Sequence, residues 1–341
     1  MQSLLLEEPG RLSLRDVPEP LSRDEKLAPG QALVQVHRGG VCGTDYHAFR
    51  GRQPFFSYPR RLGHELGVEV LQIAPDVTQI APGDRCAVEP YLNCGACIAC
   101  RRGKGNCCAH LQVLGVHRDG GFCSQLVLPA AKLHASRTLE FEQLALVETL
   151  AIGAHAVARA NVEADETVLI IGAGPIGFAA LQFVMLRGAR PVLIDINETR
   201  LAFARREFGL EKTLNAAQIT PESWESTLGD LPTAVFDATG NPQSMMRAFE
   251  FVAPGGRLTF IGLFQGDVTF HDPLFHRREM TLLATRNALP DDFSIIISSM
   301  EAGHLNTTPW ITHRARLEDV PAQFEHWLDP ASATLKAMIE I

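Results

Sequence analysis

The feature that most constrains the fold of this chain is a glycine-rich loop set between an apolar segment and a helical one. The run Gly-Ala-Gly-Pro-Ile-Gly occupies 172–177, after the apolar segment 168–171 and at the start of a helical pattern over 175–187. A second apolar segment, 191–194, is followed by Asp195, 18 residues after the last glycine of the run. A strand, a G-x-G-x-x-G turn, a helix and an acidic residue after the next strand are typical of a dinucleotide-binding unit.

Each residue type in this run has a physical role. Gly172 permits the tight turn, Gly174 lets the backbone approach a pyrophosphate, and Gly177 allows close packing of the helix on the strand. The N-terminus of the helix offers N–H groups and a partial positive charge to the phosphates. Asp195 would accept hydrogen bonds from the adenosine ribose and repel a 2′-phosphate, so we expect NAD rather than NADP. The alternative is a glycine turn that serves only the packing of an α/β domain.

Further residues are predicted to contact the same cofactor. Arg200, in the second βα turn region, is suited to stack on the adenine, although a solvated helix arginine is an equal alternative. The predicted cofactor-binding residues are Gly172, Gly174, Pro175, Ile176, Gly177, Asp195, Arg200, Gly262, Leu263, Arg286 and Asn287.

The rest of the chain divides into a strand-rich part and an α/β part. Segments 32–37, 67–73 and 124–128 have the composition of strands, which predicts an irregular, mostly antiparallel β domain. A helix is expected over 141–160. Beyond 167, short apolar segments alternate with helical ones, which predicts a parallel sheet covered on both faces. The tail carries a helix and two strands, and we expect it to rejoin the first domain.

Length and charge exclude several classes of protein. The 341 residues fit about two domains at roughly 150 residues each. The formal charge is 31 − 39 = −8, which makes nucleic acid or an anionic membrane a poor candidate partner. The stretch 168–186 is long enough to cross a bilayer, but its glycines and Pro175 favour a strand, a loop and a buried helix. Residues 1–10 show no secretory signal, so we expect a cytoplasmic protein.

Five of the eight cysteines lie within fifteen residues. Cys94, Cys97, Cys100 and Cys108 have the spacing C-x2-C-x2-C-x7-C, and four thiolates on a short lobe can close around a structural zinc ion. Cys107 could replace Cys108 as the fourth ligand. An iron–sulfur cluster and free thiols are the alternatives.

A second group of possible metal ligands is spread over two segments. Cys42 comes first, and His64 and Glu65 follow about twenty residues later. A thiolate, an imidazole and a carboxylate with one open position would suit a catalytic zinc. These groups must meet across the fold, and lone cysteines and histidines are more often structural, so this pattern alone leaves both possibilities open.

These motifs together resemble the zinc-containing medium-chain alcohol and polyol dehydrogenases over nearly the whole chain. Glu65 and Glu148 make the chain similar to the sorbitol, threonine and sugar-acid branch rather than to the ethanol branch. Three further segments, 53–60, 115–122 and 285–293, resemble the bacterial L-galactonate 5-dehydrogenase and starvation-sensing subgroup. The motifs that carry the resemblance are C-G-T-D-Y-H at 42–47, G-H-E at 63–65, G-D-R-C-A-V-E-P at 83–90, V-E-T-L-A-I-G-A-H at 147–155 and D-A-T-G-N at 237–241, with the cysteine lobe and the glycine loop.

The resemblance implies a fold and a set of roles. It implies an α/β protein with a GroES-like irregular β catalytic domain and a Rossmann domain with a doubly wound parallel sheet. Cys42, His64 and Glu65 would hold the catalytic zinc, and Glu148 would lie beside the metal, where it orients water or exchanges as a ligand. Thr44 and His47 would form a proton relay. The implied domain limits are 1–152 for the catalytic domain, with its zinc lobe at about 90–110, and 153–288 for the NAD-binding domain. Residues 289–341 are expected to return to the catalytic domain.

The implied reaction is hydride transfer from a secondary alcohol to NAD, in a homo-oligomer that is a dimer or a tetramer. Arg50, Arg52, Arg60 and Arg61 fall within twelve residues without an acidic residue among them, and Arg286 and Asn287 follow a late strand. This local positive charge favours a small anionic substrate, because guanidinium groups bind carboxylates in a bidentate geometry. The resemblance to the sugar-acid branch narrows this anionic substrate to a hexonate sugar acid, which is what we expect. A neutral polyol, L-threonine, and an NAD-binding regulatory protein without activity are the alternatives, as is a purely structural use of the arginines.

Overall fold

The chain divides into two compact units, and each is described by itself. The structure is a computed structural model that describes residues 1–22 and 25–341. One unit comprises Met1–Glu148 with Leu289–Ile341, and the other comprises Thr149–Ala288. The sequence predicts domain boundaries after residues 152 and 288, and the structure has unit boundaries after residues 148 and 288.

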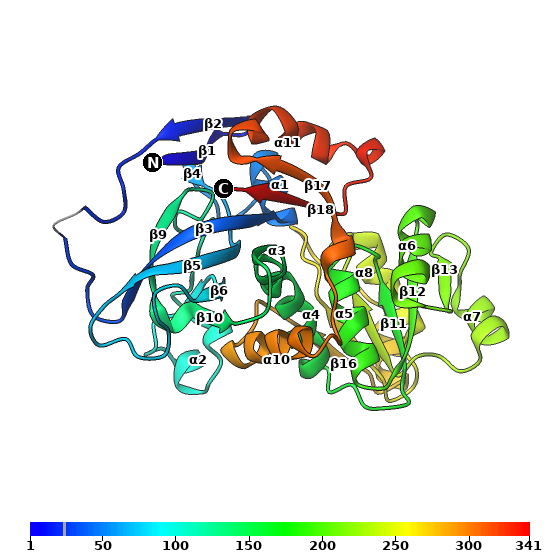
Figure 1. Ribbon diagram of the computed structural model, residues 1–341. Coiled ribbons are helices and arrows are strands. Elements are labelled where there is room, and N and C mark those ends of the chain that lie inside the picture. The colour runs from blue at the N-terminus through cyan, green and yellow to red at the C-terminus, as the bar shows by residue number, and fades with distance from the viewer. Residues whose placement is uncertain (23–24) are drawn as a thin grey trace. The chain divides into compact units, whose positions relative to one another are not determined.

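The second unit is built on a six-stranded parallel sheet (Figure 1). Its strand order is β13-β12-β11-β14-β15-β16, so the first strand of the unit lies in the middle and the chain winds outward in both directions. This is the order of a doubly wound dinucleotide-binding fold, and the predicted fold class is confirmed. The strands are β11 (Thr167–Ile171), β12 (Arg190–Asp195), β13 (Thr213–Asn215), β14 (Ala234–Asp237), β15 (Arg257–Phe260) and β16 (Thr281–Ala284).

Helices cover both faces of this sheet because its central strands are apolar on both sides. Leu169 and Ile171 belong to a buried cluster with Trp224 and Phe249 on one face. On the other face, Ile170 lies below the start of α5, where a Cβ at Gly177 would come within 3.7 Å of it. The helices are α4 (Val147–Arg159), α5 (Pro175–Leu186), α6 (Glu198–Phe208), α7 (Pro221–Leu228), α8 (Pro242–Arg247) and α9 (Asp272–Arg277).

The first unit is mostly antiparallel, as the sequence predicts. Its largest sheet has seven strands in the order β10-β6-β5-β3-β18-β17, with β9 also paired to β3, and only β17 and β18 run parallel. Strands β2-β1-β4 and β7-β8 form two smaller sheets. The strands are β1 (Gln2–Glu8), β2 (Arg11–Asp16), β3 (Gln31–Val41), β4 (Arg60–Arg61), β5 (Glu65–Ile73), β6 (Arg85–Val88), β7 (Tyr91–Leu92), β8 (Gln112–Val113), β9 (Gln125–Pro129), β10 (Leu133–Ser136), β17 (Ile311–Arg316) and β18 (Lys336–Glu340).

The helix predicted over 141–160 is two helices in the structure. α3 ends at Ala145 and α4 begins at Val147, with Leu146 between them. Leu146 is a good helix former, but it packs in a small buried cluster with Ile311 and Met338. The break between the two helices thus lies within this buried cluster. The helices of the first unit are α1 (Gly43–Phe49), α2 (Ile98–Arg101), α3 (Phe141–Ala145), α10 (Pro290–Glu301) and α11 (Val320–Leu328).

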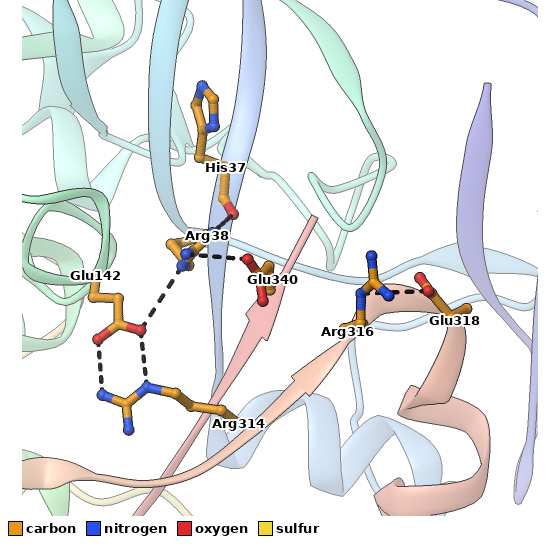
Figure 2. Close-up of polar contacts among 7 residues, drawn as sticks. All are labelled: His37, Arg38, Glu142, Arg314, Arg316, Glu318 and Glu340. Carbon is orange, nitrogen blue, oxygen red and sulfur yellow. Dashed lines mark hydrogen bonds and ion pairs between the residues drawn. The ribbon is translucent and has the colours of Figure 1, made fainter.

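The returning segment of the chain is also tied to the first unit by ion pairs (Figure 2). Arg314 of β17 donates two hydrogen bonds of 2.9 Å to the carboxylate of Glu142 in α3. Arg38 of β3 lies 3.8 Å from the same carboxylate and 3.4 Å from Glu340 of β18. Pairs this exposed contribute little free energy, about 0–1 kcal/mol each, so backbone pairing with β3 is the main attachment of the tail.

Within residues 1–22 and 25–341, no helix combines the length and apolar character needed to cross a membrane. The apolar stretch 168–186 is divided into β11, the glycine loop and α5.

An arginine–glutamate pair in the second unit generates a prediction about acid stability. Arg257 of β15 donates to both carboxylate oxygens of Glu166, at 2.8 and 2.5 Å, and to the carbonyl of Asn161. These bonds lower the pKa of Glu166 to about 2. Because the folded pKa lies below the usual value of 4.5, the pair stabilises the fold above about pH 4.5, and this contribution is lost as the pH falls towards 2.

We expect Glu166→Gln to lower the free energy of unfolding at pH 7 by about 1–3 kcal/mol, measured by urea denaturation. The difference from wild type should shrink as the pH falls below about 4.5. Arg205→Ala is the control, because Arg205 pairs with Glu198 on an exposed helix face and should change stability by less than about 0.5 kcal/mol. An equal destabilisation at pH 7 and pH 3 would contradict the role of the ion pair.

Candidate metal centre and dinucleotide loop

The structure brings Cys42, His64 and Glu65 together. Their ligand atoms all lie within 4.8 Å of one another. Cys42 follows β3 and caps α1, while Glu65 is the first residue of β5. β3 and β5 are antiparallel with Gly40 opposite Glu65, so the end of one strand and the start of the other must meet. Sheet register, rather than proximity in sequence, assembles this group.

Asp45 stands behind the imidazole of this group. Its Oδ2 accepts the backbone N–H of Cys42 at 2.9 Å, and its Oδ1 lies 3.9 Å from Nδ1 of His64. Burial raises the pKa of Asp45, partly offset by His64. Neither Oδ1 nor Nδ1 has a hydrogen-bond partner, although both are buried. A thiolate, an imidazole and a carboxylate with an acidic residue behind the imidazole are a donor set that fits zinc.

Two further buried groups surround these three residues. Glu148, at the start of α4, accepts a 2.5 Å hydrogen bond from the hydroxyl of Tyr91. Burial raises the pKa of Glu148. Lys336, on β18, donates to both carboxylate oxygens of Glu65 at 2.7 Å. Burial lowers the pKa of Lys336, but the charges of Glu65 and Cys42 more than compensate, so the pKa is raised and the ammonium stays charged.

The residues predicted for the proton relay lie on one short helix. Thr44 and His47 are three residues apart in α1, a spacing that places two side chains on the same helix face. His47 keeps contact with solvent. Partial burial, with the charges of Arg50 and Arg52, lowers the pKa of His47. The imidazole is therefore neutral at pH 7 and able to accept a proton.

The cysteine lobe forms a separate group in the first unit. The sulfur atoms of Cys94, Cys97, Cys100 and Cys108 all lie within 4.8 Å of one another, and Cys107 is exposed outside this group. Backbone N–H groups point at the sulfurs, for example Ala109 N to Cys97 Sγ at 3.5 Å. Hydrogen bonds from the backbone, that of Cys100 foremost, lower the pKa of Cys97 to about 6. These bonds favour the thiolate of Cys97, and the thiolate is the form of cysteine that binds zinc.

In the second unit, the glycine loop has the geometry of a phosphate-binding turn. Gly172 has φ +105°, and a Cβ at Gly177 would lie only 1.8 Å from the carbonyl oxygen of Gly172. Both positions therefore require glycine. Asp195 ends β12, and its Oδ2 accepts the N–H of Ala173 at 2.6 Å. This hydrogen bond within the protein holds Asp195 against the glycine loop.

The loops after the neighbouring strands lie at the same edge of the sheet. A Cβ at Gly262, after β15, would lie 2.2 Å from the backbone nitrogen of Gly240, after β14. Leu263, the next residue, is 72% exposed. A guanidinium nitrogen of Arg200 lies 3.6 Å from the position of a Cβ at Gly174, so this side chain reaches the glycine loop. The carboxyl edge of a doubly wound sheet is where dinucleotides bind.

The predicted arginine cluster is largely engaged in local contacts. Arg60 donates to Ser57 at 2.6 Å and lies 3.5 Å from Asp119, and Arg61 donates to the carbonyl of Gly120 at 2.6 Å. These contacts favour a purely structural use of Arg60 and Arg61 over contact with a substrate. Arg286 and Asn287 follow β16, and Asn287 adopts a left-handed conformation with φ +53°.

Sequence reasoning missed several residues of these sites. Asp45, Tyr91 and Lys336 surround the candidate metal ligands, and Thr239 and Gly240 lie in the loop after β14 at the candidate dinucleotide edge. A lysine within the apolar final strand is the one signal that could have indicated an internal partner, since buried lysines are almost always paired. The partner itself depends on strand order, which the sequence pattern does not provide.

Comparison with known proteins agrees with this geometry. Residues 28–138 match the family model of the alcohol dehydrogenase GroES-like domain, and residues 175–302 match that of the zinc-binding dehydrogenases. The chain is 37% identical over 319 residues to the L-galactonate-5-dehydrogenase of Escherichia coli K12, covering 92% of this chain and 91% of that protein.

Two solved structures are similar over the whole chain. One is the alcohol dehydrogenase RspB of Escherichia coli CFT073 in complex with NADH, with 27% identity, a TM-score of 0.90, and coverage of 100% of this chain and 99% of that one. The other is described as a zinc-binding dehydrogenase of Sinorhizobium meliloti 1021 bound to NADP, with 28% identity, a TM-score of 0.90 and the same coverage.

The chain belongs to the zinc-binding alcohol dehydrogenase family with a GroES-like domain. It is an oxidoreductase that acts on a CH–OH group of a small-molecule substrate.

The two groups of ligands generate a prediction about metal content. We expect about two zinc ions per chain, measured by plasma mass spectrometry on freshly purified protein. Cys97→Ser should lose one zinc and lower the melting temperature by several degrees, because a closed thiolate site contributes directly to folding. Cys42→Ser should abolish turnover with a smaller effect on melting.

Cys107→Ser is the matched control, since Cys107 lies in the same lobe but outside the sulfur group. It should leave the zinc content unchanged. Active wild-type protein with one zinc or none would overturn the assignment of two centres.

Proposed function

We propose that the protein oxidises a secondary hydroxyl of a hexonate sugar acid to a ketone with reduction of NAD. The 37% identity over nearly the whole chain to an L-galactonate-5-dehydrogenase carries this proposal. The segments 53–60 and 115–122, which resemble the L-galactonate 5-dehydrogenase and starvation-sensing subgroup, also contact each other through a Phe55–His117 ring stack with centroids 6.1 Å apart. A Cβ at Gly120 would lie 2.3 Å from the carbonyl oxygen of Gly63, the residue before His64. Subgroup-specific residues therefore border the metal ligands.

The proposed roles follow from the side chains of the site. A zinc ion held by Cys42, His64 and Glu65 would act as a Lewis acid on the substrate hydroxyl, while the nicotinamide accepts the hydride. Glu148, held by Tyr91, is a second carboxylate for this centre. The substrate proton leaves through Thr44 and then His47, whose neutral imidazole accepts it and returns it to solvent. The other zinc is proposed to be structural, held by Cys94, Cys97, Cys100 and Cys108.

We also propose that the protein is a homo-oligomer. β16 is an edge strand of the sheet in the second unit, and its side chains are mostly exposed, including Leu282 at 40%. An exposed edge with apolar side chains is a surface that a second copy can pair with. A cytoplasmic location stays a prediction from the sequence.

The cofactor preference is tested at Asp195. We expect wild type to have a higher kcat/KM for NAD than for NADP, because a 2′-phosphate beside a carboxylate is repelled. Asp195→Ala should reduce this preference by at least about tenfold, measured as the ratio of the two kcat/KM values. A wild type that prefers NADP would show that the assignment is wrong.

The substrate class is tested by NADH absorbance over aldonates, neutral polyols and L-threonine. We expect a hexonate to have the highest kcat/KM, and Arg286→Ala to raise KM for that hexonate by about tenfold more than for any neutral alcohol. Arg206→Ala is the control, since Arg206 is an exposed arginine paired with Glu207. If sorbitol is oxidised with a higher kcat/KM than every aldonate, the polyol alternative replaces the sugar-acid proposal.

The relay is tested by the pH dependence of turnover. His47→Ala should lower kcat at pH 7 by about tenfold to a hundredfold, with partial recovery as the pH rises and the alcohol ionises without help. Because the pKa of His47 is lowered, the wild-type rate should fall only when the pH drops below 6.5, the usual pKa of a histidine. The same pH–rate profile in variant and wild type would remove His47 from the mechanism.

A further inference from the structure

Lys336 is a buried cation that the proposed reaction does not use. It is the first residue of β18 and is 3% exposed. β18 pairs with β3 so that Ala337 faces Val41, and β3 pairs with β5 so that Gly40 faces Glu65. Three neighbouring strands therefore place the lysine beside the start of β5, where the proposed metal ligands lie.

The ammonium group of Lys336 is fully engaged. It donates to Oε1 and Oε2 of Glu65, both at 2.7 Å, and to the carbonyl of Val41 at 3.2 Å. These three bonds use all three donors of an ammonium group. The carboxylate of Glu65 also depends on Gly40, because a Cβ there would lie 2.1 Å from Oε2. The missing side chain at Gly40 leaves the space that this carboxylate occupies.

Glu65 thus has a permanent cation as partner, independent of any metal. A carboxylate that is 1% exposed requires such a partner, because an unpaired buried charge is strongly destabilising. The same carboxylate is within 4.8 Å of the ligand atoms of Cys42 and His64. Two cations, the ammonium and a metal ion at the proposed centre, would therefore share one carboxylate.

We propose that Lys336 is a positioning residue that competes with the catalytic metal for Glu65. The inference rests on the proposed assignment of Cys42, His64 and Glu65 as metal ligands. The lysine holds the carboxylate in place and weakens its bond to the metal, both by occupying its lone pairs and by adding positive charge beside a cation. Glu65 is then a ligand that can leave and return, and Glu148, fixed by Tyr91, is the second carboxylate available to the centre.

The proposed competition and a purely structural role of Lys336 predict different changes in zinc affinity when the lysine is replaced. If Lys336 only supported the fold, its replacement would weaken metal binding or leave it unchanged. If it competes for Glu65, Lys336→Met should bind zinc at the Cys42 centre at least about tenfold more tightly, which corresponds to about 1.4 kcal/mol. The metal-free form of this variant should melt at a lower temperature, because the buried Glu65 carboxylate loses the ammonium group that donates to both of its oxygens.

The experiment measures zinc affinity at each centre of the full-length protein by titration against a chromophoric chelator. The cysteine lobe in the same molecule is the internal control, and its affinity should not change. The visible absorption spectrum of the Co²⁺-substituted protein should shift in Lys336→Met, because the bond between Glu65 and the metal strengthens. Lys336→Arg keeps the positive charge and should bind zinc within about threefold of wild type.

A double-mutant cycle tests whether the lysine acts through Glu65. In a Glu65→Gln background, Lys336→Met should change the zinc affinity by less than about threefold. Lys336→Gln replaces Lys336→Met in both arms if the methionine variant does not fold. Unchanged or weaker zinc binding in the single variant, or an equal gain in the Glu65→Gln background, would overturn the inference. Wild-type protein that binds no zinc at Cys42 would instead refute the proposed function.

Discussion

The candidate catalytic centre depends on the register of three neighbouring strands. β3 runs antiparallel to both β5 and β18, and this pairing alone brings Cys42, Glu65 and Lys336 together from three distant parts of the sequence. Because side chains alternate along a strand, a slip of one residue between β3 and β5 would turn Glu65 to the opposite face of the sheet. Gly40 adds a second constraint, since any side chain at this position would occupy the space of the Glu65 carboxylate. The chemistry of the centre is therefore a consequence of backbone pairing.

The dinucleotide edge of the second unit is organised by a different constraint, the packing of glycine against backbone. Gly177 meets the carbonyl of Gly172, and Gly262 meets the backbone of Gly240, so neighbouring loops approach as closely as main chains can. Asp195 joins this arrangement through its bond to Ala173. The residue expected to select the cofactor also holds the loop that would bind its phosphates. Cofactor preference and the shape of the glycine loop therefore both depend on Asp195.

The dinucleotide loop and the cysteine lobe could be predicted because the residues that indicate them lie close together in the sequence. The glycine loop, the strand before it and the acidic residue after the next strand lie within about thirty residues, and the four cysteines of the lobe lie within fifteen. The break at Leu146 could not be predicted, because the segment 141–152 contains no glycine or proline that would signal a helix end. Lys336 and Tyr91 were missed because each acquires its role from a partner that only the fold supplies, Glu65 and Glu148 respectively. Arg60 and Arg61 also depend on the fold, because a run of charge in the sequence does not reveal their contacts with Asp119 and Gly120.

The two candidate metal centres differ in what holds their ligands before a metal binds. In the lobe, Cys94 to Cys108 form a short loop whose sulfurs are approached by backbone N–H groups, and little apolar burial fixes it, since α2 has no buried residue. A metal ion bound there would replace a hydrophobic core as the source of order. At the Cys42 centre, His64 and Glu65 are buried beside a sheet, and Lys336 holds the Glu65 carboxylate by two hydrogen bonds. A centre whose ligands are held by the protein can leave a position open for substrate without losing its shape, whereas a centre shaped by its metal must be closed by four protein ligands.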